Sequence, residues 1–469
     1  MKDPIMKQIL ALSVLVLVIS ACGVTKKYAR PDLKTDSLYR EATTGDTTNM
    51  ANLPWQELFS DSILKALIQE GITENLDLKN AIQNIVQAQA TLSQARLAFL
   101  PDLSLGVNGS RNKTSEASLN FPPGINIRTL TSSFQLQLST SWEADIWGKL
   151  NSSKNAAIAD FLQTDAARRA IQTRLIAEIA NNYYTLMAYD QQLAITELTL
   201  KKRIENVETM RALKEGAVVN GAAVVQSEAS RYDAEVSIPD IKQNIRTVEN
   251  ALSVLLGRPP GPINRNKLSD QQSVKDLQVG VPAQLLANRP DVQEAEYAFR
   301  SAFENTNVAR TMFYPSLTLS ASGGLSSLQL KNFFNRSIFY NLMAGLTQPI
   351  FSRGSNRANL IRNQSLQIQA LNNFQQSLLN AGQEVSNSLY AYQMALEKES
   401  SRIKQVAALE KAVEFTEELL RYSSATNYTD VLTSEQNLLA AQLSGVNDRL
   451  QQLQAIVNLY EALGGGWKD

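Results

Sequence analysis

The chain has 469 residues, and its 45 Lys and Arg balance its 45 Asp and Glu, so the formal net charge is zero and gives no support for nucleic-acid binding. It contains no histidine, which excludes Ser-His-Asp and Cys-His nucleophiles, histidine general bases and His-ligated zinc. The single cysteine, Cys22, excludes an intrachain disulfide and a thiolate metal cluster. We therefore expect no enzyme, no metal site and no cofactor other than a covalent lipid.

Residues 1–21 have the form of a secretory signal peptide. Lysines precede a largely apolar run of 13 residues, Ile9–Ala21, which is shorter than the ~20 residues that a membrane-spanning helix needs. Ser20-Ala21 precede Cys22 as in a bacterial lipobox, so we expect Cys22 to be lipidated and residues 22–53 to form an extended, polar lead-in. The alternative is an ordinary signal peptide with an incidental cysteine. Translation starts at Met1 or at Met6.

The rest of the chain contains two copies of one unit. With a shift of 214 residues, 77–109 align with 291–323 without a gap. With a shift of 204, Ile146-Trp147-Gly148-Lys149 aligns with Ile350-Phe351-Ser352-Arg353, and with a shift of 207, Ser227-Glu228 aligns with Ser434-Glu435. We therefore divide the chain into a first repeat at 54–256, a linker at 257–283 and a second repeat at 284–469.

Each copy begins with a predicted helix that is followed by a predicted β-hairpin. Apolar residues spaced alternately four and three apart run from Ala81 to Phe99 and from Ala295 to Phe313, which predicts helices that pack against neighbouring helices. The period then changes to two, directly after a proline, and predicts hairpins at about 102–146 and 315–350. Strands with one apolar and one polar face suit a membrane barrel and a soluble sandwich equally.

A long helical hairpin follows the strands in both copies. Residues 149–215 contain no glycine and no proline, and as one helix they would span roughly 100 Å. Gly216 and Gly221 mark a turn before a returning helix. In the second copy the returning helix precedes Gly464-Gly465-Gly466. The sequence therefore predicts a mainly α fold in which each copy is a helix, a β-hairpin and a long helical hairpin.

The number of predicted strands points to an oligomer. Two hairpins supply four strands, whereas the smallest natural membrane barrels have about eight. Open strand edges are not viable in lipid, so protomers must combine their strands, and the coiled-coil seams also need partners. A secreted, lipid-anchored oligomer with a shared barrel and a long helical extension is expected to be a conduit.

At these residues the chain resembles TolC-type outer-membrane efflux proteins, in their lipoprotein branch. The segments that carry the resemblance are Cys22, Trp55 with Phe59, Asn75–Leu78, Trp142-Glu143 to Lys149, Arg289-Pro290-Asp291-Val292 with Ala295-Glu296, Pro349-Ile350-Phe351, Arg421-Tyr422 and Ala462–Trp467. The resemblance implies a homotrimer in the outer membrane of a Gram-negative bacterium, with a twelve-stranded β-barrel and an α-helical periplasmic tunnel. It also implies an equatorial belt built from 257–283 and the chain ends.

The same resemblance implies partners and a gate. The partners are a periplasmic adaptor (membrane fusion) protein and an inner-membrane transporter of the resistance-nodulation-division (RND) type, with passive passage of drugs or other small molecules. The gate lies at the turns 214–225 and 421–433, where Asp430 matches an acidic position of the relatives and Thr433 stands where many have another Asp. Asp430 is equally consistent with a helix cap. The further candidates for gate or adaptor contacts are Arg421, Tyr422, Tyr428 and Lys214.

Two other function classes remain as alternatives. Type I protein secretion is the alternative within the conduit class, and a periplasmic coiled-coil adaptor or tether lipoprotein without a pore is the alternative outside it. An enzyme without histidine would need carboxylate pairs, as in glycoside hydrolysis. Glu57 with Asp61, and Glu417 with Glu418, are paired only as helix neighbours, and we expect them to be solvated.

Overall fold

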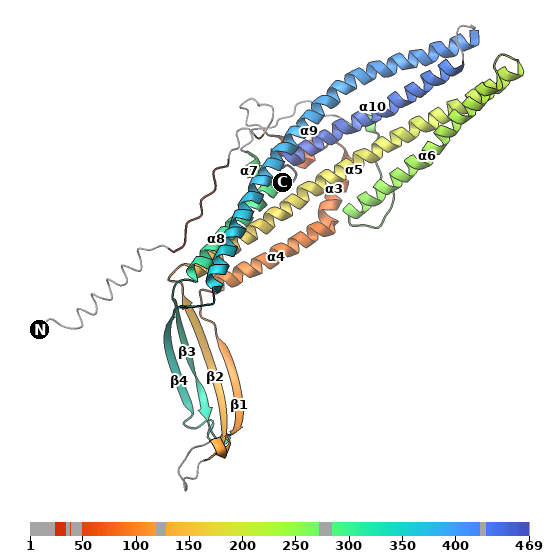
Figure 1. The fold of residues 1–469 in the computed structure, drawn as a ribbon. Coiled ribbons are helices and arrows are strands. Elements are labelled where there is room, and N and C mark those ends of the chain that lie inside the picture. Colours follow the sequence, from red (N-terminus) through yellow and green to blue (C-terminus); the bar gives the residue numbers. More distant parts are fainter. Residues whose placement is uncertain are drawn as a thin grey trace. The chain divides into compact units, whose positions relative to one another are not determined.

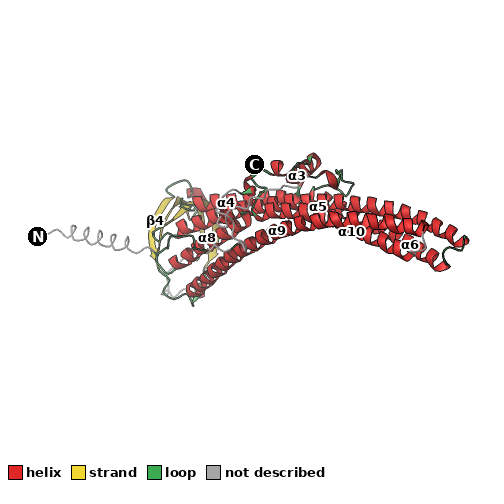
Figure 2. Ribbon diagram, turned by 90° about the horizontal axis from the view of Figure 1, so that it is seen from above, coloured by secondary structure: helices red, strands yellow, loops and turns green. Residues whose placement is uncertain are grey.

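The computed structural model describes residues 24–33, 38, 49–118, 128–271, 284–422 and 428–468. The described residues are mainly helical, and their strands form a single sheet (Figures 1 and 2). None of the helices in these ranges combines the length and the apolar character that a membrane crossing requires. The predicted signal peptide, Cys22, parts of the lead-in and most of the second half of the linker lie outside the described residues.

The chain divides into two compact units, and each combines segments from both copies of the repeat. Unit 1 comprises the described residues of Met1–Pro31, Ile85–Gln163 and Glu296–Asn373. Unit 2 comprises those of Asp32–Asn84, Thr164–Ala295 and Phe374–Asp469. Unit 1 therefore contains the strands, and unit 2 contains the turn at 216–220 and the described residues on both sides of 423–427.

The helices follow the predicted order in both copies (Figure 1). The stretch without glycine and proline is a single helix, α5, and its counterpart α9 is of similar length, at 67 and 68 residues. The first copy contains α2 (Trp55–Leu58), α3 (Ser62–Glu74), α4 (Leu76–Leu97), α5 (Lys149–Glu215) and α6 (Gly221–Leu255). The second contains α7 (Leu285–Asn288), α8 (Pro290–Thr311), α9 (Ser355–Tyr422) and α10 (Tyr428–Ala462).

The four strands form one antiparallel sheet in the order β1-β2-β3-β4. β1 (Ser104–Lys113) and β2 (Leu130–Ala144) are the hairpin of the first copy, and β3 (Ser316–Ser327) and β4 (Ile338–Thr347) are that of the second. The predicted hairpins are confirmed, and β2 and β3 join the two copies through eleven residue pairs from Phe134↔Ser327 to Ala144↔Leu317.

Unit 2 has a hydrophobic core to which α3, α5, α6, α9 and α10 all contribute. Tyr183 on α5 is fully buried there, and its hydroxyl donates to Oδ2 of Asp61 at 2.8 Å. Oδ1 of Asp61 accepts from the backbone N–H of Ile63 and so caps α3, while Gln271 donates to Oδ2. The expectation of a solvated Asp61 is therefore wrong, because this carboxylate has partners that offset its burial.

In unit 1, the segment that follows the predicted anchor lies against α8 without forming a helix or strand. The backbone N–H of Lys26 donates to Oδ1 of Asn307 at 3.0 Å, and Nδ2 of Asn307 donates to the carbonyl of Lys26 at 2.9 Å. The ring of Tyr28 packs on Phe299 and Phe303. Residues 24–31 are therefore held to unit 1 by a reciprocal backbone contact and by aromatic packing.

Candidate functional site

The register of the sheet gathers apolar side chains from all four strands on one side. Opposite residues in antiparallel strands share a face, and the pairs Leu136↔Leu325 and Leu325↔Ile338 extend the apolar alternation of one hairpin into the next. The apolar face consists of Leu105, Val107, Phe134, Leu136, Leu138, Trp142, Leu317, Leu319, Ala321, Leu325, Ile338, Tyr340, Leu342, Ala344 and Leu346. Thr140 interrupts it, and Arg111, Lys113, Ser132 and Ser327 lie on the same side at the end of the sheet far from the helices.

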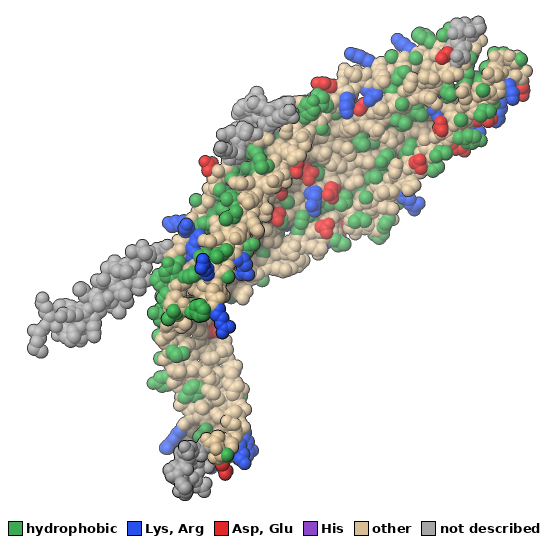
Figure 3. Space-filling model, in the orientation of Figure 1, with side chains coloured by type: hydrophobic (Ala, Val, Ile, Leu, Met, Phe, Trp, Pro, Cys, Tyr) green, Lys and Arg blue, Asp and Glu red, His purple; other side chains and the backbone are tan. Residues whose placement is uncertain are grey.

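The opposite side, the polar face, is hydrophilic, and its one charged strand residue is Glu143 at the end of β2, which Lys149 neutralises. Apart from Glu143, this face consists of Ser104, Asn108, Ser110, Gln135, Gln137, Ser139, Ser141, Ser316, Thr318, Ser320, Ser322 and Asn341, with Phe339 and Met343 as apolar exceptions. β3 and β4 contain no Asp, Glu, Lys or Arg. On the side visible in Figure 3, charged side chains lie near the ends of the strands and not in their middle.

Both margins of the sheet are open in the described chain. β1 pairs only with β2, and β4 pairs only with β3, among the residues that the structure describes. The edge strands also carry its most exposed apolar side chains, with Val107 on β1 at 74% and Tyr340 on β4 at 81% exposure. Unpaired edges that present apolar side chains are unfavourable in water, so this sheet is suited to further pairing in an apolar medium.

The first turn of α10 and the adjoining ends of α5 and α6 lie in unit 2 and are joined by a small hydrophobic cluster, while residues 423–427 of the predicted second gate turn lie outside the described residues. We define the tip cluster as Met210 on α5, Val224 on α6, and Tyr428 and Val431 on α10, all buried. Burial raises the pKa of the Tyr428 hydroxyl, and a hydrogen bond with Ser227 partly opposes the shift. The first turn of α10 therefore packs against both helices of the other hairpin.

Polar contacts next to the tip cluster link the same helices. Nδ2 of Asn206 on α5 donates to Oε1 of Glu435 on α10 at 2.6 Å. Burial raises the pKa of Glu435, and the hydrogen bond from Asn206 opposes the shift. Arg203 is only 5% exposed and donates through Nη1 to the carbonyl of Ser230 on α6, while its burial lowers its pKa. α5, α6 and α10 are thus tied together by both apolar and polar contacts.

The predicted gate residues differ in their surroundings. Tyr428 belongs to the tip cluster, whereas Tyr422 is 86% exposed at the end of α9, next to Arg421. Asp430 lies in the first turn of α10, and Lys214 lies in the last turn of α5. Their roles in gating and adaptor contact stay predictions.

Sequence patterns missed Arg203, Asn206 and Glu435. One available signal was the alignment of Ser227-Glu228 with Ser434-Glu435. In the first copy this pair supplies Glu228, which binds Arg211 at 2.7 Å, and in the second it supplies Glu435. Ser227, which bonds with Tyr428, and Glu435, which bonds with Asn206, therefore link the two hairpins, whereas Glu228 acts within the first hairpin.

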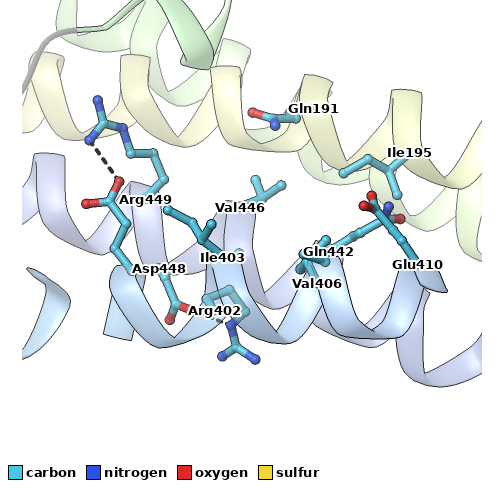
Figure 4. Close-up of a pocket in the computed structure, with 13 residues that line it drawn as sticks. Gln191, Ile195, Arg402, Ile403, Val406, Glu410, Gln442, Val446, Asp448 and Arg449 are labelled. Carbon is cyan, nitrogen blue, oxygen red and sulfur yellow. Dashed lines mark hydrogen bonds and ion pairs between the residues drawn. The ribbon is translucent and has the colours of Figure 1, made fainter. Parts of the chain in front are cut away.

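A groove of about 570 Å³ lies between α5, α9 and α10 within unit 2 (Figure 4). Its apolar lining includes Ile195, Ile403 and Val446. Nε of Arg402 lies 2.8 Å from Oδ2 of Asp448, and Arg449 faces Glu399 at 3.7 Å. The groove therefore has apolar walls with ion pairs beside them, which suits the side chains of another helix better than a charged solute.

A second cavity in unit 2, of about 760 Å³, contains the motif Arg289-Pro290-Asp291. Arg289 is buried, binds Asp291 and Glu384, and donates to the carbonyl of Ala462. The pKa of Glu461 is raised to about 7, mainly because the carboxyl group is buried and to a lesser extent because of the negative charge of Glu384. Among the described residues no group of three or more His, Cys, Asp or Glu side chains is arranged to hold a metal ion. Arg289 therefore serves chiefly to fix the end of α10.

Comparison with known proteins identifies the family of the chain. The family model described as outer membrane efflux protein matches residues 67–258 and 281–465, one stretch in each copy. The chain is 29% identical to the probable efflux pump outer membrane protein TtgC of Pseudomonas putida, over 99% of this chain and 96% of that protein. It is 28% identical to the cation efflux system protein CusC of Escherichia coli, over 97% of each.

Solved structures agree with the fold. The open-state MtrE outer membrane channel of Neisseria gonorrhoeae is 26% identical and superposes with a TM-score of 0.83, over 95% of this chain and 99% of that one. The outer-membrane channel OprN, at 22% identity, has a TM-score of 0.87 over 96% and 100% of the two chains. These relatives are channel components rather than enzymes. With both copies matched by the family model, the chain belongs to the outer membrane efflux protein family.

Proposed function

We propose that three copies of this chain combine their sheets into one outer-membrane barrel and form the passive exit duct of a tripartite efflux pump. The observation that carries the proposal is the sheet, which has an apolar face, a polar face whose one charged residue, Glu143, is bound by Lys149, and two unpaired edges. Pairing β1 of one copy with β4 of the next removes the edges and places the apolar face toward lipid. Three copies, as implied by the resemblance, give twelve strands.

The polar face would then line the pore. Serine, threonine, glutamine and asparagine solvate ions without favouring either sign, so we expect weak ion selectivity in the barrel. The groove between α5, α9 and α10 would receive side chains of a neighbouring copy, because Ile403 on its wall is 65% exposed in the single chain.

A lipid on Cys22 would anchor the chain close to the point where the strands meet the helices. Thr25, three residues further on, lies against Gly148 between β2 and α5, because a Cβ on Gly148 would be 3.3 Å from Oγ1 of Thr25. Three extended residues reach at most about 11 Å. The acyl chains would therefore enter the membrane close to the helix ends of the strands, which supports the lipidated form.

An RND-type transporter and a periplasmic adaptor would supply energy and cargo. Relatives of similar identity are named for efflux of antibiotics, toluene and cations. Because these names differ while the chain length and family are shared, we infer that the transporter, and not the duct, selects the cargo. The same names favour small-molecule efflux over protein secretion.

The test is purification of the full chain in detergent, with mass measurement of the particle and single-channel recording in a planar bilayer. The proposal predicts a particle of three chains that gives discrete conductance steps with weak selectivity between potassium and chloride. A particle that stays soluble after removal of detergent and of the lipid, and that gives no conductance, would refute it and favour the adaptor class.

A further inference from the structure

The loop between β4 and α9, together with the first turn of α9, exposes apolar and cationic side chains near each other. Ile350 is 97% exposed and Phe351 is 84% exposed. Arg353 and Arg357 follow, and both are exposed as well. Within the described part of the chain, neither arginine makes an ion pair, a hydrogen bond or a ring contact with another side chain. We call Ile350, Phe351, Arg353 and Arg357 the loop patch.

The aligned segment of the first copy has the same residue types with internal partners. Nε1 of Trp147, aligned with Phe351, donates to the carbonyl of Pro315 at 2.7 Å. Nζ of Lys149, aligned with Arg353, lies 2.9 Å from Oε1 of Glu143. The first copy therefore uses its aromatic and its cationic residue within the fold.

The second copy lacks the acidic residues that would neutralise the patch. With the same shift of 204 residues, Glu143 aligns with Thr347, and Asp145 aligns with Pro349. Both side chains that replace these carboxylates are uncharged. Arg353 also has a positive φ of 51°, a backbone conformation that favours glycine. The backbone conformation at this position therefore gives no reason for an arginine.

Carboxylates at the helix ends of the strands are already engaged. Asp102 accepts from the backbone N–H of Ser141, Asp145 accepts from the N–H groups of Leu150 and Asn151, and Glu143 binds Lys149. Of these groups, only Oδ2 of Asp102, next to β1, has no hydrogen-bond donor within the described part of the chain, so a second copy would bring at most one such carboxylate oxygen to the two arginines. An anion from outside the protein would complete the charge balance of the loop patch.

We propose that the loop patch binds the anionic headgroups of phospholipids at the surface of the membrane, an inference that rests on the proposed insertion of the sheet into lipid. Ile350 and Phe351 insert at the acyl boundary, and the arginines bind lipid phosphates. Arginine presents a planar fork of donors that matches phosphate, and aromatic side chains favour the interface. Figure 3 shows Lys and Arg side chains gathered where the helices of unit 1 meet the strands.

The test uses the full chain in detergent and counts bound lipids by native mass spectrometry. The probes are phosphatidylglycerol, which is anionic, and phosphatidylcholine with the same acyl chains, which is neutral overall. Each basic residue near an anionic surface contributes about fivefold in affinity. The double variant Arg353→Gln with Arg357→Gln should therefore bind phosphatidylglycerol about 30-fold more weakly than the parent. Phe351→Ser should weaken both lipids equally.

Lys149→Gln is the matched control, because Lys149 aligns with Arg353 but is neutralised by Glu143. This variant should change the affinity for phosphatidylglycerol less than twofold. The inference is overturned if the parent binds both lipids equally, or if the double variant keeps the preference. It is also overturned if the same concentration of inorganic phosphate displaces phosphatidylglycerol, or if the double variant dissociates into single chains. Conductance of the same samples separates the two proposals, since a conducting parent without lipid preference refutes only the loop patch.

Discussion

The tip cluster predicts that one tyrosine holds the two helical hairpins together. Tyr428 is 5% exposed and packs with Met210, Val224 and Val431, so Tyr428→Ala removes the largest side chain of a small, isolated cluster. Truncating a buried aromatic residue costs about 3–5 kcal/mol, and the lower end applies because neighbours near a turn relax into the space. About 3 kcal/mol corresponds to an increase of about 100-fold in local opening.

Hydrogen–deuterium exchange of the full chain in detergent measures that opening. Amides near the ends of α5 and α6 and in the first turns of α10 should exchange about 100-fold faster in Tyr428→Ala. Tyr428→Phe removes only the hydroxyl that bonds with Ser227 and should increase exchange by about tenfold at most. Pore conductance should rise in the order of the exchange rates if this contact keeps the tip closed.

Tyr422→Ala is the control because it removes the same side chain from an exposed position at the end of α9, in the same hairpin. It should leave the exchange of these amides unchanged. The reasoning fails if Tyr428→Ala leaves the exchange of these amides unchanged, or if Tyr422→Ala accelerates it equally. A faster exchange with unchanged conductance would keep the structural role and remove the tip cluster from the gate.

Three further predictions concern other parts of the chain. Asp430→Ala should raise conductance with a loss of at most about 1 kcal/mol in α10, and an unchanged conductance in a folded variant would remove Asp430 from the gate. Gly324→Ala should lower the melting temperature, at a cost of about 1–3 kcal/mol or more, because its Cβ would lie 1.9 Å from the carbonyl oxygen of Leu136; Gly345→Ala, with no atom within 4 Å, should not. Glu461 binds its proton more tightly in the folded chain, so its contribution to stability is present at low pH and is lost as the pH rises from about 4.5 through about 7. Glu461→Gln should therefore be more stable than the parent by about 1–2 kcal/mol at pH 8 and equally stable near pH 4, and parallel unfolding curves across that range would contradict this.

Local patterns were sufficient to predict the elements of the fold. α5 occupies the whole of 149–215 because nothing in that stretch interrupts a helix, and the second copy repeats the arrangement in α9. The strands were found because alternation with period two starts directly after a proline in both copies. The duplication strengthened each assignment, because a weak pattern seen twice at the same place is more specific than one seen once.

Contacts between distant segments could not be predicted in the same way. Asp61 was expected on a solvated face, yet Tyr183 and Gln271 approach it from more than a hundred residues away in the sequence. Arg203 lies within a polar stretch of α5, and its burial becomes evident only when α6 lies beside it. Periodicity identifies a face of a helix but does not identify the element that covers it.

The pairing of β2 with β3 explains why the duplication yields one amphipathic sheet rather than two unrelated hairpins. Side chains alternate with period two, so a slip of one residue between these strands would place the apolar side of one hairpin beside the polar side of the other. The observed register opposes Leu136 to Leu325 and Gln137 to Gly324, which keeps the two copies in phase. The same requirement applies wherever β4 meets β1 of another copy, because only a register that preserves this phase gives a continuous apolar surface toward lipid.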